Sequence, residues 1–329
     1  METKQTTLLK ILLFLLTGVV FVAAMIAYSN ARSGREGRFV EEGWIREGSG
    51  EAQKKIDRVF DVKPRGELTV DTDAGSVTVE AWDKNQVSVV VEMSGDEQQL
   101  KRFRVEFSSD DSTVSIVGKQ RGRFFPWHWQ SSDIVFRIKV PPHFRPKIST
   151  AGGDVNVTGV DANVRCETSG GTLKLFSIVG DIYGETSGGD VLVRNVTGDV
   201  QGHTSGGDIK VDSVLGSVKV TTSGGEVVLL RVNGRIFGET SGGNIEARLY
   251  GQNRGIHLET SGGNVSVYVS KDVAANVQAS TSGGSVKCDL PVMVLGKISE
   301  DELHGKINGG GNLIELSTSG GNINIRSVD

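Results

Sequence analysis

The sequence predicts an all-β, single-domain β-solenoid with about 18 residues per coil, preceded by an N-terminal hydrophobic helix. The first supporting observation is a repeated tetrapeptide, and the second is an alternation of apolar and polar residues between its copies. The tetrapeptide Thr-Ser-Gly-Gly begins at Thr168, Thr186, Thr204, Thr222, Thr240, Thr260, Thr281 and Thr318, and a near copy begins at Thr150. A fixed period near 20 residues indicates a stack of identical supersecondary units.

The tetrapeptide is expected to form one corner of each coil. A reversal within a few residues favours backbone with positive φ, which glycine adopts without steric penalty. The threonine side chain is expected to point inward and to bond turn backbone. Asn308-Gly309-Gly310 is interpreted as a degenerate copy. The predicted structural turn ladder comprises Thr168, Gly170, Gly171, Thr186, Gly188, Gly189, Thr204, Gly206, Gly207, Thr222, Gly224, Gly225, Thr240, Gly242 and Gly243.

Strand alternation assigns the interior of each coil. In one coil, Val191, Val193 and Val196 point inward from the first strand, and Val200 and Thr204 from the second. Apolar residues recur at these positions in successive coils, whereas outward positions vary in type. The outward faces are therefore solvated, or they contact a partner.

The predicted domain organisation has four parts. Residues 1–28 are a signal anchor or signal peptide, and 29–54 are a linker. Residues 55–148 form irregular N-terminal β coils with helix and aromatic-loop insertions, and 149–329 form the regular Thr-Ser-Gly-Gly β-solenoid. Capping-box spacing predicts a short helix over 97–103, from Ser94 with Glu97, and one helical turn from Ser299 with Glu302.

The N-terminal apolar stretch, residues 11–28, has two possible roles. A signal peptide would be cleaved near Ser29-Asn30-Ala31. A signal anchor needs about 17–25 apolar residues, which this stretch just provides. Both alternatives predict a membrane-anchored or secreted protein of the cell envelope, outside the cytoplasm. The predicted membrane partner contacts the chain through residues 11–28.

The only cysteines, Cys166 and Cys288, are expected to be buried free thiols. They lie six to seven coils apart, roughly 30 Å at about 4.8 Å per coil, which is too far for a disulfide. No cysteine or histidine has a partner at ligand spacing in the sequence, so no metal site and no cofactor are predicted.

Residues 121–130 are the least repetitive stretch. They contain Phe124, Phe125, Trp127 and Trp129, which are candidates for a partner-binding loop. The loop either caps the first coil or exposes an aromatic patch to a membrane surface or a sugar ring. At the other end, the chain stops at Asp329 directly after a strand. An uncapped end makes end-to-end self-association possible.

No catalytic constellation is apparent in the sequence. Glu185, Glu239 and Glu259 share one outward column, but we expect coil spacing to isolate them on a solvated face. The net charge of −4 and the lack of a basic patch argue against a nucleic-acid partner. We expect no enzymatic activity.

The chain resembles a known bacterial family in several segments. These are Val140-Pro141-Pro142, the Gly-Gly-Asp/Asn-Val steps, Asn308-Gly309-Gly310-Gly311-Asn312 and Ser319-Gly320-Gly321-Asn322-Ile323. They resemble the "putative adhesin" family, domains of unknown function with β-strand repeats, over roughly residues 55–329. The resemblance implies an envelope-associated β-solenoid, often behind an N-terminal membrane segment, and it supplies no catalytic residues.

The expected function is that of a non-enzymatic cell-envelope scaffold that presents a surface to an unknown protein or glycan partner. Two alternatives remain open. One is a sensory or regulatory envelope component that binds a ligand or a membrane partner, and the other is a carbohydrate-active β-helix enzyme.

Overall fold

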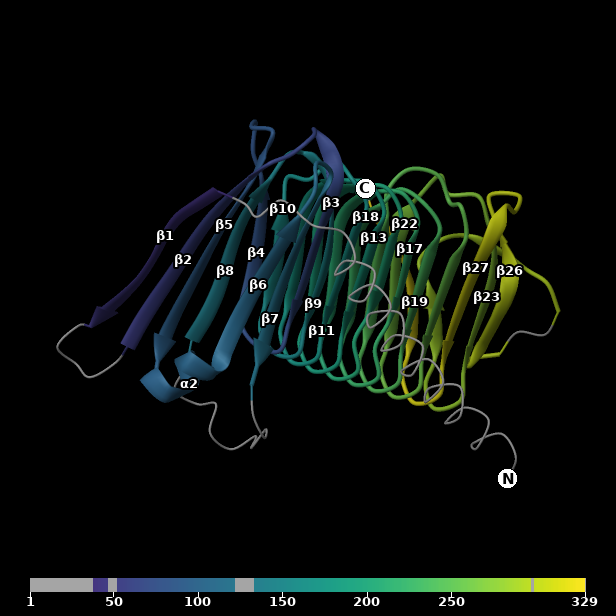
Figure 1. Ribbon diagram of the computed structural model, residues 1–329. Helices are drawn as coiled ribbons and strands as arrows, with labels where there is room; N and C mark the ends of the chain where they lie inside the picture. Colours follow the sequence, from purple (N-terminus) through teal and green to yellow (C-terminus); the bar gives the residue numbers. More distant parts are fainter. Residues whose placement is uncertain (1–37, 47–51, 122–132, 297–298, 329) are drawn as a thin grey trace, which may run out of the picture.

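The computed structural model describes residues 38–46, 52–121, 133–296 and 299–328. Two fourteen-stranded sheets face each other along the length of the molecule, with turns aligned along its edges (Figure 1). A single apolar core runs between the sheets. In the described residues the one α-helix is α2 (Glu97–Arg102). The predicted β-solenoid is confirmed, whereas the predicted N-terminal hydrophobic helix lies outside the described residues.

The two sheets are named here A and B, and their strands are given in spatial order. Sheet A contains β1 (Arg38–Arg46), β2 (Ala52–Asp61), β5 (Gln86–Gly95), β8 (Asp133–Val140), β4 (Ser76–Ala81), β10 (Val155–Thr158), β12 (Leu173–Val179), β14 (Val191–Thr197), β16 (Ile209–Leu215), β18 (Val227–Val232), β20 (Ile245–Leu249), β22 (Val265–Ser270), β28 (Ile323–Val328) and β24 (Val286–Cys288). Sheet B contains β25 (Val292–Val294), β26 (Glu302–Ile307), β23 (Ala275–Thr281), β27 (Asn312–Thr318), β21 (Ile256–Thr260), β19 (Ile236–Thr240), β17 (Val218–Thr221), β15 (Val200–His203), β13 (Ile182–Thr186), β11 (Val164–Thr168), β9 (His143–Thr150), β3 (Arg65–Thr72), β7 (Thr113–Gln120) and β6 (Phe103–Ser109).

In the regular coils, each turn of the solenoid contributes one strand to each sheet. The strands pair in parallel with equivalent repeat positions side by side, as in Val191 with Ile209 and Val200 with Val218. Val191, Val193, Val196 and Val200 are all buried. The inward positions predicted from strand alternation are therefore confirmed.

A left-handed residue interrupts the alternation within four sheet-A strands, β12, β14, β16 and β18. Asn195, between the inward Val193 and Val196, has a φ of 56°. Equivalent residues in other coils are Ser177, Ser213 and Arg231. A single residue in this conformation turns the strand so that a third side chain reaches the core.

Close approach between coils, rather than positive φ, explains the second glycine of the tetrapeptide. A Cβ on Gly189 would lie 2.1 Å from the carbonyl oxygen of Gly171 in the preceding coil. The same clash, at 2.0–2.1 Å, would occur at Gly171, Gly207, Gly225 and Gly243, and none of them has a positive φ in the left-handed range. The expectation that these glycines provide positive φ is therefore wrong.

The first glycine of the tetrapeptide has more room. For Gly188 the nearest atom to an added Cβ would be 3.7 Å away, and for Gly170 no atom would lie within 4 Å. Both of these first glycines are exposed at the surface. The two glycines of one tetrapeptide therefore differ in what they tolerate.

The tetrapeptide threonines point inward, as predicted, and join adjacent coils. Thr204 is fully buried, and its hydroxyl donates to the carbonyl oxygen of Gly189 in the preceding coil at 2.8 Å. The Thr204 hydroxyl oxygen in turn accepts from the backbone N–H of Gly207 at 3.2 Å. Equivalent hydroxyl-to-carbonyl bonds of 2.7–3.0 Å are made by Thr168, Thr186, Thr222, Thr240, Thr260, Thr281 and Thr318. Each hydroxyl thus satisfies a carbonyl and an N–H at a corner.

The Asp or Asn after Gly-Gly also bonds between coils. The carboxylate of Asp190 accepts from the backbone N–H of Asp208, and the side-chain oxygen of Asn244 accepts from that of Asn264. The opposite turn repeats the pattern, with Asp181 accepting from the N–H of Asp199. These side chains therefore link each turn to the next coil.

The N-terminal part departs from the regular coil. Range 38–46, assigned to a linker from the sequence, forms β1, which pairs antiparallel with β2, and β2 already begins at Ala52. Strands β2, β5 and β8 continue antiparallel, and β6 and β7 form an antiparallel pair. The predicted helix exists as α2, but its N-cap is Asp96 rather than Ser94.

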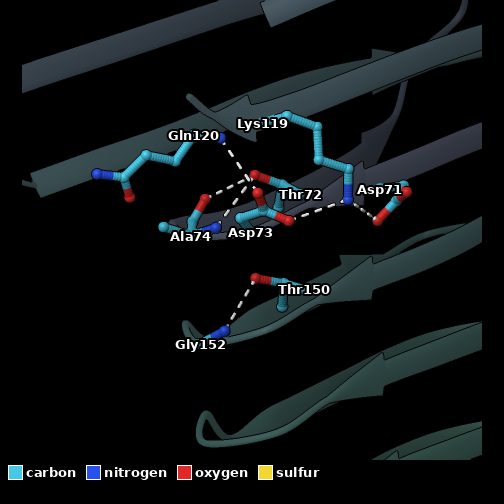
Figure 2. A network of polar contacts seen from close by, with 8 residues as sticks. All are labelled: Asp71, Thr72, Asp73, Ala74, Lys119, Gln120, Thr150 and Gly152. Atoms are coloured by element: carbon cyan, nitrogen blue, oxygen red, sulfur yellow. Dashed lines mark hydrogen bonds and ion pairs between the residues drawn. The ribbon is translucent and has the colours of Figure 1, made fainter. Parts of the chain in front are cut away.

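A polar network anchors the first corner, at Thr72 (Figure 2). Unlike the tetrapeptide threonines, Thr72 donates its hydroxyl to the Ala74 carbonyl of its own turn. Lys119 bridges the carboxylates of Asp71 and Asp73 at 2.9 and 3.0 Å. Burial acts to lower the pKa of Lys119, but hydrogen bonds and charge from both aspartates outweigh it, so this pKa is raised.

The C-terminal coil is inserted rather than terminal. Strand β27 lies between β21 and β23, and β28 lies between β22 and β24. Accordingly, the Thr318 hydroxyl donates to Gly263, and that of Thr281 donates to Gly321. The last two rungs are therefore reversed in space relative to their order in the sequence.

The end of sheet B is covered by the antiparallel strands β26 and β25. The helical turn predicted from Ser299 with Glu302 is absent from the described residues, since Glu302 begins β26. Asn308, Gly309 and Gly310 have positive φ and join β26 to β27, so they are not a repeat corner. Strand β28, the last described strand, is paired on both sides rather than lying at the edge of sheet A, and end-to-end association stays a prediction.

The two glycines of one corner provide a stability test. We expect Gly189→Ala to lower the free energy of unfolding by about 1–3 kcal/mol, because its Cβ would overlap the Gly171 carbonyl. Gly188→Ala should change the free energy of unfolding by less than about 1 kcal/mol. Its effect on the unfolded chain, whose backbone loses conformational freedom, acts in the stabilising direction. Urea midpoints of both variants measure this difference. Equal destabilisation would contradict the proposed role of coil-to-coil approach.

The threonine bonds can be tested at Thr204. Thr204→Val keeps the shape but leaves the Gly189 carbonyl and the Gly207 N–H without this partner. We expect a loss of about 1–3 kcal/mol in urea unfolding. Thr197→Val, at an exposed position of the same coil, should stay within about 0.5 kcal/mol of wild type. A neutral Thr204→Val would show that the hydroxyl ladder contributes nothing.

Candidate functional site: a cationic groove on sheet B

A shallow groove of about 870 Å³ crosses the outer face of sheet B. It runs over β9, β11, β13, β15, β17 and β19, and strand alternation aims every second side chain of these strands into it. Its lining residues are Glu67, Arg145, Pro146, Lys147, Asn163, Val164, Arg165, Asp181, Ile182, Tyr183, Asp199, Val200, Gln201, Ser217, Val218, Lys219, Arg235 and Phe237. The groove therefore joins outward residues from several coils.

The groove is cationic although the chain is acidic overall. Its lining holds five Arg or Lys side chains and three carboxylates, against a net charge of −4 for the whole chain. Two of the carboxylates, Asp181 and Asp199, accept backbone N–H groups of the next coil. The third, Glu67, forms an ion pair with Lys147 at 2.9 Å.

Three of the cations are left without a carboxylate. Arg165 pairs with Glu167 beside the groove. Within the described residues, no ion pair is seen for Arg145, Lys219 or Arg235. The sequence did not reveal this patch, because its members are dispersed over more than 90 residues and meet only through the coil register.

Aromatic rings lie beside these cations. The guanidinium of Arg165 lies 4.1 Å from the ring centroid of Tyr183, and the ammonium of Lys219 lies 5.2 Å from that of Phe237. Such contacts hold both groups in place. The Tyr183 hydroxyl donates to Glu185 at 2.6 Å. Burial, followed by the hydrogen bond and charge of Glu185, raises the pKa of Tyr183 to about 12.

A second cluster lies on the same face. His257 Nε2 is 3.9 Å from a carboxylate oxygen of Glu239 and 3.8 Å from one of Glu259, and Nδ1 is 3.0 Å from Glu315. Glu239, His257 and Glu259 are arranged so that they could hold a metal ion. The expectation that Glu239 and Glu259 are isolated is wrong, because they are direct neighbours on β19 and β21. The sequence showed the Glu column but not the convergence of His257 on it.

The cluster does not have the geometry of a glycosidase. Paired catalytic carboxylates leave space of about 5–9.5 Å for a sugar and, in inverting enzymes, a water. Here the ligand atoms of Glu239, His257 and Glu259 lie within 4.8 Å of one another, and the imidazole lies between the carboxylates. This arrangement favours ligation over sugar hydrolysis.

The other predicted sites have different outcomes. The loop with Phe124, Phe125, Trp127 and Trp129 lies outside the described residues, as does the expected membrane segment 11–28. In the described part of the chain, no helix has the length and apolarity that crossing a membrane requires.

Both cysteines are free. Cys166 is fully buried, and burial together with the nearby Glu167 charge raises the pKa of its thiol. Cys288, expected to be buried, is only half-buried, because β24 is a short strand at the edge of sheet A.

The Tyr183–Glu185 contact in the groove wall has a spectroscopic test. An ultraviolet titration of tyrosinate should show a transition near pH 12 that Tyr183→Phe removes. Glu185→Gln should lower this pKa, because it removes a negative charge that opposes ionisation. Because the pKa of Tyr183 is higher in the folded than in the unfolded chain, the neutral hydroxyl stabilises the fold. This contribution is complete below about pH 10 and is lost as the pH rises through about 12. Circular dichroism at each pH checks folding, and a transition that survives Tyr183→Phe would contradict the assignment.

Comparisons with known proteins address the family. No curated protein matches this sequence. Similar solved structures include a "putative adhesin" from Bacteroides fragilis, with 13% identity over 82% of this chain and 96% of that chain, at a TM-score of 0.42. A "putative adhesin" from Parabacteroides distasonis has 13% identity over 84% and 98%, at a TM-score of 0.32.

A further structure, a "putative lipid binding protein" from Parabacteroides distasonis, has 15% identity over 84% of this chain and 97% of that chain, at a TM-score of 0.31. Similarity at this level does not indicate what the present chain binds. The family model Toastrack DUF4097 matches residues 66–326, from the start of β3 to the last coil. The chain is therefore a member of the Toastrack DUF4097 family.

Proposed function

We propose that this protein is a non-enzymatic binding scaffold of the cell envelope, and that its sheet-B groove binds an anionic glycan. The carrying observation is the set of three cations, Arg145, Lys219 and Arg235, that have no carboxylate partner in the described groove. Carboxylates or sulfates of a glycan would supply partners for these side chains.

The aromatic rings favour a sugar polymer over a small free anion. Tyr183 and Phe237 lie in the groove beside Arg165 and Lys219, and each presents an apolar surface next to a charge. Sugar rings have apolar faces and polar edges, so an aromatic ring with flanking donors matches them. An open sheet face can also accommodate a glycan polymer that extends beyond the groove.

Placement in the envelope rests on the N-terminal stretch. Residues 11–28 would act as a membrane anchor or as a signal peptide, and the solenoid would then lie outside the cytoplasm. A sensory or regulatory role shares ligand binding with the adhesive role, and differs in whether binding is transmitted to another component. The groove is the proposed site in either case.

The test compares matched charge variants of the full chain. Binding of heparin fragments, as a sulfated-glycan probe, is measured by titration calorimetry against neutral dextran. Arg145→Gln/Lys219→Gln/Arg235→Gln should weaken heparin binding at least about tenfold, since even about 0.5 kcal/mol per lost contact sums to that factor.

The control removes the same charge from the opposite sheet. Lys174→Gln/Arg194→Gln/Lys210→Gln changes three cations of β12, β14 and β16 on sheet A, and should leave binding nearly unchanged. If both triple variants weaken binding equally, attraction is general and the groove is not the site. Tight binding of dextran would contradict an anionic ligand.

A further inference from the structure

Four side chains converge on sheet B next to the end of the groove, and none of them belongs to its lining. They are Glu239 on β19, His257 and Glu259 on β21, and Glu315 on β27. We refer to them as the His257 cluster. The groove residue Phe237 is its neighbour in the same strand as Glu239.

Strand register brings these residues together. Phe237 is opposite His257, Glu239 is opposite Glu259, and His257 is opposite Glu315. Neighbouring strands lie about 4.7–4.9 Å apart, so side chains of one row are in direct reach. Glu315 reaches His257 only because β27 is inserted beside β21, although 58 residues separate the two in the chain.

The imidazole ring of His257 is held on two sides. Its Nδ1 lies 3.0 Å from Glu315 Oε2, and its plane stacks on Phe237 with centroids 4.9 Å apart at 13°. With the Nδ1 proton donated to Glu315, the Nε2 lone pair faces Glu239 and Glu259, at 3.9 and 3.8 Å. A carboxylate behind a histidine is the usual support for a metal-ligating imidazole.

The charge balance of the cluster favours a cation. In the described part of the chain, the ion pairs seen for Glu239, Glu259 and Glu315 all involve His257. Three carboxylates therefore share one imidazole, and all three are only about half exposed. A bound divalent ion would remove the repulsion between them.

We propose that Glu239, His257 and Glu259 bind a divalent transition-metal ion, best matched by zinc(II), with Glu315 positioning the imidazole. One nitrogen and two carboxylate oxygens form a three-ligand set that leaves a fourth position open. The imidazole disfavours calcium and magnesium, which prefer oxygen ligands.

The distances are compatible with this ion. Zinc bond lengths of about 2.0–2.2 Å place tetrahedral ligand atoms about 3.3–3.5 Å apart. The Nε2-to-oxygen distances of 3.8 and 3.9 Å are about 0.5 Å longer. All three ligand atoms lie within 4.8 Å of one another, and the two glutamate side chains, which are 41% and 55% exposed, have room to rotate toward an ion.

The experiment titrates zinc(II) into the chelator-treated full chain by calorimetry in excess magnesium. We expect one saturable equivalent at this site and a rise in the thermal midpoint of unfolding with zinc. Glu315→Ala should weaken binding by about 10–100-fold through loss of imidazole support. His257→Ala and Glu239→Gln/Glu259→Gln should weaken it further.

The matched control is His203→Ala, a histidine of sheet B whose Nδ1 contacts Thr221 Oγ1 at 2.7 Å. It should retain wild-type zinc affinity. The proposal is overturned if the wild type binds no zinc, or if His203→Ala loses as much affinity as His257→Ala. Circular dichroism verifies the fold of each variant, and the double glutamine variant keeps the test decisive if His257→Ala fails to fold.

Discussion

The spacing between coils is the constraint on which the rest of the structure depends. Parallel strands of adjacent coils pair at about 4.8 Å, and the corner that joins the two sheets must keep the same spacing. At that distance the Gly171 carbonyl oxygen occupies the place of a Cβ on Gly189. An added Cβ at Gly189 would therefore require the two coils to shift apart at this corner.

The same spacing determines how corner polar groups are satisfied. Corner backbone cannot pair within its own strand, so Thr204 reaches back to Gly189 and Asp190 reaches forward to Asp208. Each of these side chains forms a hydrogen bond to a backbone group of an adjacent coil. Stability of such a stack comes from neighbour-to-neighbour contacts, and outward residues are free to vary.

The sequence was sufficient for the fold because the interior repeats. An 18-residue period with alternating valines identifies inward Val191 and Thr204 without any knowledge of neighbours. It could not distinguish the reasons for Gly188 and Gly189, since steric contact between coils is not a property of one coil. Nor could it predict that the last coil is inserted, because the register of Ile323 fits beside Val265 as well as beside Val286.

The candidate sites escaped prediction for a related reason. Arg145 and Arg235 line the same groove although several coils separate them, and neither has a motif around it. His257 and Glu315 are 58 residues apart and become neighbours through the inserted strand alone. Local spacing identifies ligands that share a turn or strand, whereas a solenoid assembles sites across strands. In the sequence, only the shared outward repeat position of Glu239 and Glu259 indicated that these side chains lie in one row.

The groove and the His257 cluster have opposite charge, and this links them physically. Phe237 lies between the two sites: the Lys219 ammonium is 5.2 Å from its ring centroid, and the His257 ring is 4.9 Å away, each shorter than the screening length of about 8–10 Å. If the groove binds an anionic polymer as proposed, these carboxylates would repel a polymer that extends past Phe237. A divalent ion at the proposed site would remove this repulsion, so that metal and polymer would each favour the binding of the other by the same free energy. Coupling of this kind needs no movement of the strands, because the rigid register already holds both sites on one face.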